Sequence, residues 1–177
     1  MAVLTIGEVK EFLEIGHAVQ DTTVQSLIDG VEDFTERQCG IKLVSASRTE
    51  DHAGGSLALR PDVAPVTSVT KLERLSSDGT LETVDATLYR LERNRIIRWD
   101  RARWDRDTVY RVTFTGGFST VPDGLKHAML QLVRRYYDNR GGKQQQAAQG
   151  FGVTWMNFSA SDAYKLLRPY VATGFVG

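Results

Sequence analysis

Histidine, cysteine and acidic side chains are the first candidates for catalysis or metal binding in this sequence. The three histidines are His17, His52 and His127, and the single cysteine is Cys39. No histidine stands in a His-Glu-x-x-His pattern or beside a pair of cysteines, which are spacings typical of metal sites. We therefore predict that the protein holds no metal and no other cofactor, and that its histidines are ordinary surface or boundary residues.

A nucleophile would need an oriented base within hydrogen-bonding reach. Asp51 and His52 are neighbours, but adjacent residues of a strand point to opposite faces of a sheet. Cys39 lies near the end of a predicted helix, where the helix dipole does not favour a thiolate, and we interpret it as a small buried apolar residue. Gly116-Gly117 follow a strand and precede a helix, but the Lys-Ser/Thr pair of a phosphate-binding loop is missing. We predict a turn at these glycines and no enzymatic activity.

Arginine is concentrated between residues 90 and 107, with two tryptophans among the arginines. Such a segment could stack on bases and contact phosphates, although four acidic residues dilute its charge. Arginine and tryptophan are also preferred in protein interfaces. Three interpretations stay open: a solvated hairpin, a subunit interface and a nucleic-acid contact. The candidate interface residues are Arg98, Trp99, Arg103 and Trp104.

Length and composition are those of an ordinary globular chain. The 177 residues suit one main domain. The 22 basic and 22 acidic side chains cancel, which argues against a dedicated nucleic-acid-binding protein, because such proteins carry a basic excess. No stretch approaches the ~18 apolar residues of a membrane-spanning helix, so we expect no membrane partner.

Three helices are predicted, at about residues 5–15, 21–38 and 122–140. Thr5 followed by Glu8 is a capping box that begins the first. Gly40 is placed to end the second, and Pro122 suits the first position of the third. The second helix has an apolar face at helical spacing, made of Val24, Leu27, Ile28, Val31 and Phe34.

Residues 43–117 are predicted to form short antiparallel strands. Asp78-Gly79 and Arg93-Asn94 are hairpin turn signals between runs that favour β-structure. Another turn is expected at Gly54-Gly55, between strands at about residues 47–50 and 56–59. Alternation in the last strand places three aromatic or branched side chains on one face, namely Tyr110, Val112 and Phe114.

The C-terminal part reads as a polar linker followed by a short amphipathic helix. Residues 141–150 are rich in glycine and glutamine, as in flexible linkers. Ordering so short a helix costs as much as its few apolar side chains return, so it must dock on its own domain or on a partner. We predict an α+β protein: a small helical bundle core with an inserted antiparallel β-rich portion, residues 1–141, and a flexible C-terminal docking tail, residues 142–177. The candidate docking residues are Trp155, Phe158, Tyr164, Leu167 and Tyr170.

The order of these segments resembles that of phage head–tail connector proteins. The opening at residues 4–13 is similar to their T-x-x-E-V-K-x-x-L motif, and residues 65–69 are similar to their proline-led strand. Residues 114–128 resemble their passage of aromatic-T-x-G-aromatic, then V-P, then L-K-x-A, and residues 136–140 resemble the usual end of that helix. The resemblance covers residues 4 to 141, and the tail is absent from the shortest members.

This resemblance implies a structural role without catalysis. Family members form a symmetric ring, here expected to hold twelve subunits, beneath the portal ring of the DNA-filled head. The implied partners are other copies of the chain, the portal, and a stopper or tail-completion protein, while double-stranded DNA passes without specific binding. The implied location is the virion neck, and the host cytoplasm during assembly.

Two other functions remain as alternatives. A packaging accessory protein would bind DNA through the arginine-rich segment, and this binding would weaken with salt. A tail-terminator ring would be mainly β and would lack the two leading helices.

Overall fold

The computed structural model describes residues 3–16, 21–76, 79–139 and 162–171. Contacts divide the chain into two compact units. One, called here the helical unit, comprises residues 1–39 and 121–176, and the other, the β unit, comprises residues 40–120. The predicted α+β class, with an antiparallel β-rich portion inserted between helices, is confirmed.

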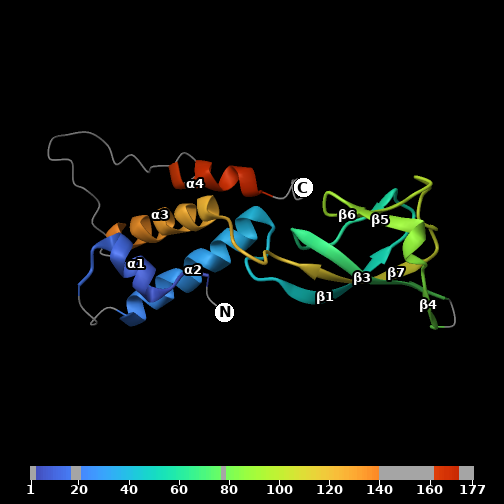
Figure 1. Ribbon diagram of the computed structural model, residues 1–177, viewed down its shortest axis with the longest axis horizontal. Helices are drawn as coiled ribbons and strands as arrows, with labels where there is room; N and C mark the ends of the chain where they lie inside the picture. The colour runs from blue at the N-terminus through green and yellow to red at the C-terminus, as the bar shows by residue number, and fades with distance from the viewer. Residues whose placement is uncertain (1–2, 17–20, 77–78, 140–161, 172–177) are drawn as a thin grey trace, which may run out of the picture. The chain divides into compact units, whose positions relative to one another are not determined.

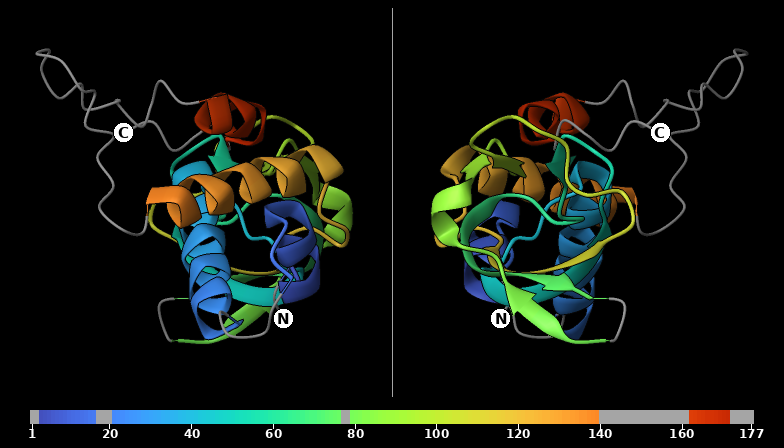
Figure 2. Two further views of the ribbon diagram at one scale, coloured as in Figure 1. Left: turned by 90° about the vertical axis from the view of Figure 1, so that its left-hand side faces the viewer. Right: turned by 90° about the vertical axis from the view of Figure 1, so that its right-hand side faces the viewer.

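The described part of the helical unit contains four α-helices. These are α1 (Ile6–Leu13), α2 (Asp21–Cys39), α3 (Asp123–Asn139) and α4 (Asp162–Leu167), which continues into the 3-10 turn η4 (Arg168–Tyr170). Helix α3 contacts each of the other three and lies between α4 and the pair formed by α1 and α2 (Figures 1 and 2). It is therefore the central helix of this unit.

The helix starts follow from local sequence. The side chain of Thr5 accepts a hydrogen bond from the backbone of Glu8, and the carboxylate of Glu8 accepts one from the backbone of Thr5, so the predicted capping box is present. Helix α2 ends at Cys39, directly before Gly40 as expected. Helix α3 begins at Asp123, and the carbonyl of Pro122 accepts its first hydrogen bonds. Pro122 thus lies just before the helix rather than in its first position.

The buried face of α2 is shifted slightly from the prediction. Leu27 and Phe34 are only half-buried, whereas Thr35 and Cys39 are fully buried together with three predicted core residues. Four-residue steps from Val31 to Thr35 and then to Cys39 keep a row of small side chains on one side of the helix. Thr35 and Cys39 thus continue the buried row of the helix, and Phe34 lies beside that row at the edge of the core.

The β unit holds two antiparallel sheets. The larger has the order β1 (Ala46–Ala53), β7 (Val109–Gly116), β3 (Val66–Leu75) and β4 (Leu81–Thr83). The smaller has the order β2 (Ala58–Leu59), β6 (Arg95–Arg98) and β5 (Tyr89–Glu92), and a 3-10 turn, η2 (Ala86–Leu88), precedes β5. Figure 1 shows the strands of both sheets within this unit.

Both sheets contribute to one core. The predicted alternation along β7 is confirmed, because Tyr110, Val112 and Phe114 are buried while their neighbours are more exposed. Leu72 comes from the same sheet, and Ile96 comes from the smaller sheet. The full cluster is Leu59, Val66, Leu72, Tyr89, Ile96, Trp104, Tyr110, Val112 and Phe114.

The predicted hairpin turns are present. Strands β3 and β4 pair across the turn that contains Gly79, and β5 and β6 pair across Arg93 and Asn94. Both Arg93 and Asn94 have positive φ, 49° and 63°, as a two-residue type I′ turn requires. The chain also bends at Gly54-Gly55, but the flanking strands do not pair with each other. There β1 joins β7 while β2 joins β6, so the chain passes from one sheet to the other.

Hydrogen bonds join the two ends of the β unit. The backbone N–H of Phe118 donates to the carbonyl of Lys42 at 3.2 Å, and the N–H of Ser45 donates to the carbonyl of Phe118 at 3.1 Å. The segment that leaves α2 and the segment that enters α3 are thus held side by side.

Candidate functional site

The two described histidines and the cysteine do not form a reactive cluster. His127 packs edge-on against Phe12, with ring centroids 6.3 Å apart, and His17 lies outside the described residues. Within the described ranges no three His, Cys, Asp or Glu side chains are grouped as a metal site would need. Cys39 is fully buried, as interpreted from the sequence, and burial raises the pKa of its thiol to about 11. A thiol in that state is a poor nucleophile.

Asp51 and His52 lie on opposite faces of β1 and have separate partners. Asp51 forms a bidentate ion pair with Arg111 on the adjacent strand, and both oxygen–nitrogen distances are 2.8 Å. The hydrogen bonds from Arg111 hold the pKa of Asp51 below its usual value. His52 Nε2 lies 3.3 Å from a carboxylate oxygen of Glu50. Asp51 therefore serves as a cross-strand contact and does not orient the imidazole of His52.

The glycine pair at the end of β7 is a close backbone contact. Gly117 has a φ of 109°, and a Cβ built on it would lie 2.3 Å from the carbonyl oxygen of Val44. Its own N–H donates to the carbonyl of Pro65 at 2.8 Å. An N–H used in this way is not available to a phosphate, so the interpretation of this pair as a turn agrees with the contacts.

The arginine-rich segment divides into buried and exposed parts. Trp104 is 3% exposed, its indole N–H donates to the carbonyl of Ile96 at 3.3 Å, and its ring meets Tyr110 at a centroid distance of 4.9 Å. Backbone hydrogen bonds to Gly55 and Ser56 hold it in this position. Trp104 is thus a core residue of the β unit and is not part of its surface.

Trp99, in contrast, is 55% exposed. The guanidinium of Arg90 lies 4.5 Å from the centroid of its ring, which is a cation–π contact. The backbone of Trp99 donates to the carbonyl of Leu88, another exposed apolar residue. The neighbouring Arg98 forms a bidentate ion pair with Asp100. The hydrogen bonds of this pair are the main reason why the pKa of Asp100 is lowered. We call Leu88, Arg90 and Trp99 the Trp99 patch.

A groove of about 610 Å³ lies on the β unit beside β2 and β6. Four arginines line it, and its one described carboxylate, Glu92, is already paired with Arg90. Arg103, a candidate interface residue, donates to the carbonyl of Gly55 at 3.1 Å, and it pairs with no carboxylate of the described residues. Leu57 at the same groove is 56% exposed. The arginines that line this groove, called the arginine groove below, are Arg60, Arg93, Arg95 and Arg103.

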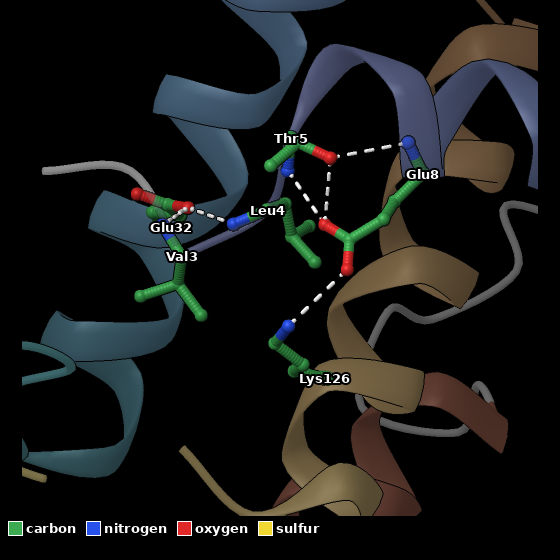
Figure 3. Close-up of polar contacts among 6 residues, drawn as sticks. All are labelled: Val3, Leu4, Thr5, Glu8, Glu32 and Lys126. Carbon is green, nitrogen blue, oxygen red and sulfur yellow. Dashed lines mark hydrogen bonds and ion pairs between the residues drawn. The ribbon is translucent and has the colours of Figure 1, made fainter. Parts of the chain in front are cut away.

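The start of the helical unit is acidic and firmly anchored. The carboxylate of Glu32 accepts hydrogen bonds from the backbone N–H groups of Val3 and Leu4, at 2.7 and 2.9 Å. Glu8 bonds to Thr5 at one oxygen and reaches Lys126 of α3 with the other, at 3.3 Å (Figure 3). Hydrogen bonds from Thr5 are the main reason why the pKa of Glu8 is lowered. Glu8 and Glu32 thus fix this end of the chain.

Helix α4 packs on its own helical unit. Leu167 is 0% exposed, and the thiol of Cys39 lies 3.9 Å from its carbonyl oxygen. Tyr170 reaches Gly124 of α3, where an added Cβ would lie 2.5 Å from the tyrosine hydroxyl. Of the other candidate docking residues, Trp155 and Phe158 lie outside the described residues, as does the side chain of Tyr164. The structure thus shows one docked position for this helix, and contact with a partner stays a prediction.

Sequence reasoning overlooked the groove. Arg60 and Leu57 carry no motif, and they meet Arg93 and Arg95 only because β2 pairs with β6. The weak signal that could have found them is the basic excess around the second hairpin. In the part of the chain that the structure describes, no helix is long and apolar enough to cross a membrane.

Comparison with protein families matches residues 2–167 to the family described as head completion protein. No curated protein is significantly similar in sequence. Several solved structures share the fold. One is the neck of an empty gene transfer agent particle computed with C6 symmetry: TM-score 0.68, 20% identity, covering 99% of this chain and 92% of that chain. Another is the virion of the native particle, with TM-score 0.68, 21% identity and the same coverage. A third is the native neck computed with C12 symmetry, with TM-score 0.56, 22% identity and coverage of 96% and 90%.

Proposed function

Because the chain belongs to the head completion protein family, we propose that it forms a ring in the virion neck, between the portal and the tail. Its role is structural, at the connection of head and tail. The family match over residues 2–167 carries the proposal, and the C6 and C12 symmetry of the similar necks supports a ring. A head-to-tail contact closes into a ring when its rotation closes. We expect twelve copies, which extend the DNA channel and offer a platform to the stopper or tail-completion protein.

The Trp99 patch is the first surface that we assign to contacts within this ring. A tryptophan and an arginine stacked on each other are typical of the residues that dominate binding energy. Trp99 is 55% exposed although it is large and apolar. Trp104, by contrast, lies in the core of the β unit and is left out of this proposed contact.

The tail is the second proposed contact, with the portal or an adjacent subunit. Trp155, Phe158, Tyr164, Leu167 and Tyr170 remain the proposed docking residues. Since Leu167 is buried beside Cys39, its use by a partner requires α4 to leave this position. Many copies in a ring would then add weak single contacts to a strong attachment.

Passage of DNA fits the neutral charge of the chain. Each lysine or arginine bound to phosphate strengthens binding to DNA and would slow its exit. With 22 basic and 22 acidic residues, the chain has no overall basic excess for such retention. We therefore propose a channel that DNA crosses without specific binding.

The mass in solution tests this function. We expect light scattering to show one discrete ring-on-ring complex when the protein is mixed with its cognate portal ring. In the same assay Trp99→Ala should weaken ring formation by about 30-fold, the effect of losing a ~2 kcal/mol contact. Val44→Ala, which changes another exposed apolar residue of the β unit, is the matched control. Absence of any complex, together with salt-sensitive binding to duplex DNA, would instead favour a packaging accessory protein.

A deletion of residues 150–177 tests the tail separately. We expect the remaining chain to keep its cooperative unfolding and to lose attachment to the portal. Unimpaired attachment of this truncated chain would refute docking through the tail.

A further inference from the structure

We propose that the arginine groove binds Glu11 and Glu14, at the C-terminal end of α1, of a second copy of this chain; these two residues are called the acidic α1 surface below. The inference rests on the proposed ring, and it names the two surfaces that meet in one of the ring's contacts.

The groove carries uncompensated positive charge. The side chains of Arg60, Arg93 and Arg95 make no ion pair or hydrogen bond with any described residue, and the side chain of Arg103 donates only to the backbone carbonyl of Gly55. Guanidinium groups that share one concave surface repel one another, and a nearby carboxylate relieves that repulsion. The groove is therefore suited to a ligand that carries carboxylates or phosphates.

Negative charge that could compensate these arginines is found in the helical unit. Residues 1–39 contain eight acidic side chains and only two basic ones. Six of the eight have a partner within the chain, among them Glu8 with Lys126 and Glu32 with backbone N–H groups. Glu11 and Glu14, both exposed, have none among the described residues. They stand three residues apart at the C-terminal end of α1.

The exposed side chain of Leu57 indicates that the arginine groove binds a protein and not DNA. It is 56% exposed beside the groove arginines, and an apolar side chain among arginines suits a protein interface. A DNA-binding surface is more polar and relies mainly on phosphate contacts. A second copy supplies both the carboxylates and the apolar surface of a folded helix.

A contact between two different surfaces of the same chain is of the kind that builds rings. The groove and the α1 surface are different parts of the chain, so their contact is head-to-tail, and each copy offers one of each to its neighbours. Opposite charges also speed the encounter of subunits and select the register in which they meet. Self-association should therefore weaken as salt is raised.

Charge reversal provides the test. One variant carries Arg60→Glu and Arg93→Asp, which breaks no described hydrogen bond, and Asp tolerates the positive φ of residue 93. The other carries Glu11→Arg and Glu14→Arg, where the added positive charges suit the end of a helix. Circular dichroism should show that both remain folded.

The expected result is complementation. Measured by light scattering, alone and on the cognate portal ring, each variant should associate at least 10-fold more weakly than the wild type. An equimolar mixture should recover association, because each reversed surface then meets an opposite charge on the other variant. The recovered ring would alternate the two variants and would hold an even number of copies.

Three outcomes would overturn the inference. If both variants associate like the wild type, the arginine groove is not an interface between copies, and the proposed ring still stands. If the wild type itself forms no ring even on the portal, the proposed function fails together with the inference. If self-association is intact while Arg60→Glu/Arg93→Asp abolishes a salt-sensitive binding to duplex DNA, the groove belongs to DNA.

Discussion

Replacing Leu167 with alanine should uncover the thiol of Cys39 while the rest of the helical unit stays folded. Leu167 is 0% exposed and lies against Cys39, and α4 is a helix of only six residues. Truncating a buried leucine costs ~2–5 kcal/mol. Even the lower value would raise the fraction of molecules with α4 undocked by about 30-fold, since each ~1.4 kcal/mol is a factor of ten.

The chemistry of the thiol makes this displacement measurable. In the closed state the pKa of Cys39 is raised to about 11 by burial, so at pH 8 about one thiol in a thousand is ionised, compared with about a quarter at the ordinary pKa of ~8.5. Labelling by a thiol reagent therefore proceeds through molecules in which α4 has moved away. Because the chain has a single cysteine, the measured rate reports this site alone.

We expect Leu167→Ala to be labelled about 30-fold faster than the wild type at pH 8. Leu166→Ala is the control, because Leu166 belongs to the same helix and is 41% exposed, so its rate should stay within twofold of the wild type. Equal rates for the two variants, with unchanged circular dichroism, would refute the idea that Leu167 holds α4 in place. Loss of cooperative unfolding in Leu167→Ala would also refute it, by showing that α4 is inseparable from the fold.

Three further predictions concern stability, each measured by denaturant unfolding. Trp104→Ala should lower the free energy of unfolding by ~3–5 kcal/mol, because it empties the centre of the β unit. Gly117→Ala should lower the free energy of unfolding more than Gly79→Ala does. Both glycines have positive φ, but only at Gly117 would the added Cβ meet backbone atoms. Similar losses for the two variants would contradict this close contact. Thr5→Ala should cost ~0.5–2 kcal/mol at neutral pH and should raise the lowered pKa of Glu8. A carboxyl whose pKa is lowered by folding stabilises the fold at pH values above its unfolded pKa. The loss caused by Thr5→Ala should therefore shrink as pH falls through the folded pKa of Glu8. A loss that does not change with pH would contradict the reasoning.

Local signals predicted much of the fold. The capping box of Thr5 and Glu8, the turn at Arg93-Asn94 and the alternation that buries Phe114 each depend on residues within a few positions. Short-range rules of this kind act before any tertiary contact forms.

Contacts between distant residues were beyond that reasoning. The pairing of β1 with β7 joins Ala46 to Gly116, and nothing near the Gly54 turn signals that its flanking strands enter different sheets. Trp104 looked like part of an exposed arginine-rich hairpin, yet hydrogen bonds to Gly55 and Ser56 fix it inward. The arginine groove gathers residues from three separate segments, so its charge becomes visible only after folding.

The hydrogen bonds of Phe118 with Lys42 and Ser45 have a consequence for folding kinetics. Helix α2 ends at Cys39 and its partner α3 begins at Asp123, so their contact has a large sequence separation, which slows folding. The β unit has a core of its own and is synthesised before α3. Once it has folded, the segment after α2 and the segment before α3 are already joined by hydrogen bonds. Most of the entropy cost of closing the loop between the two helices has then been met in advance. The inserted unit thus converts a slow, long-range search between the helices into a short-range one.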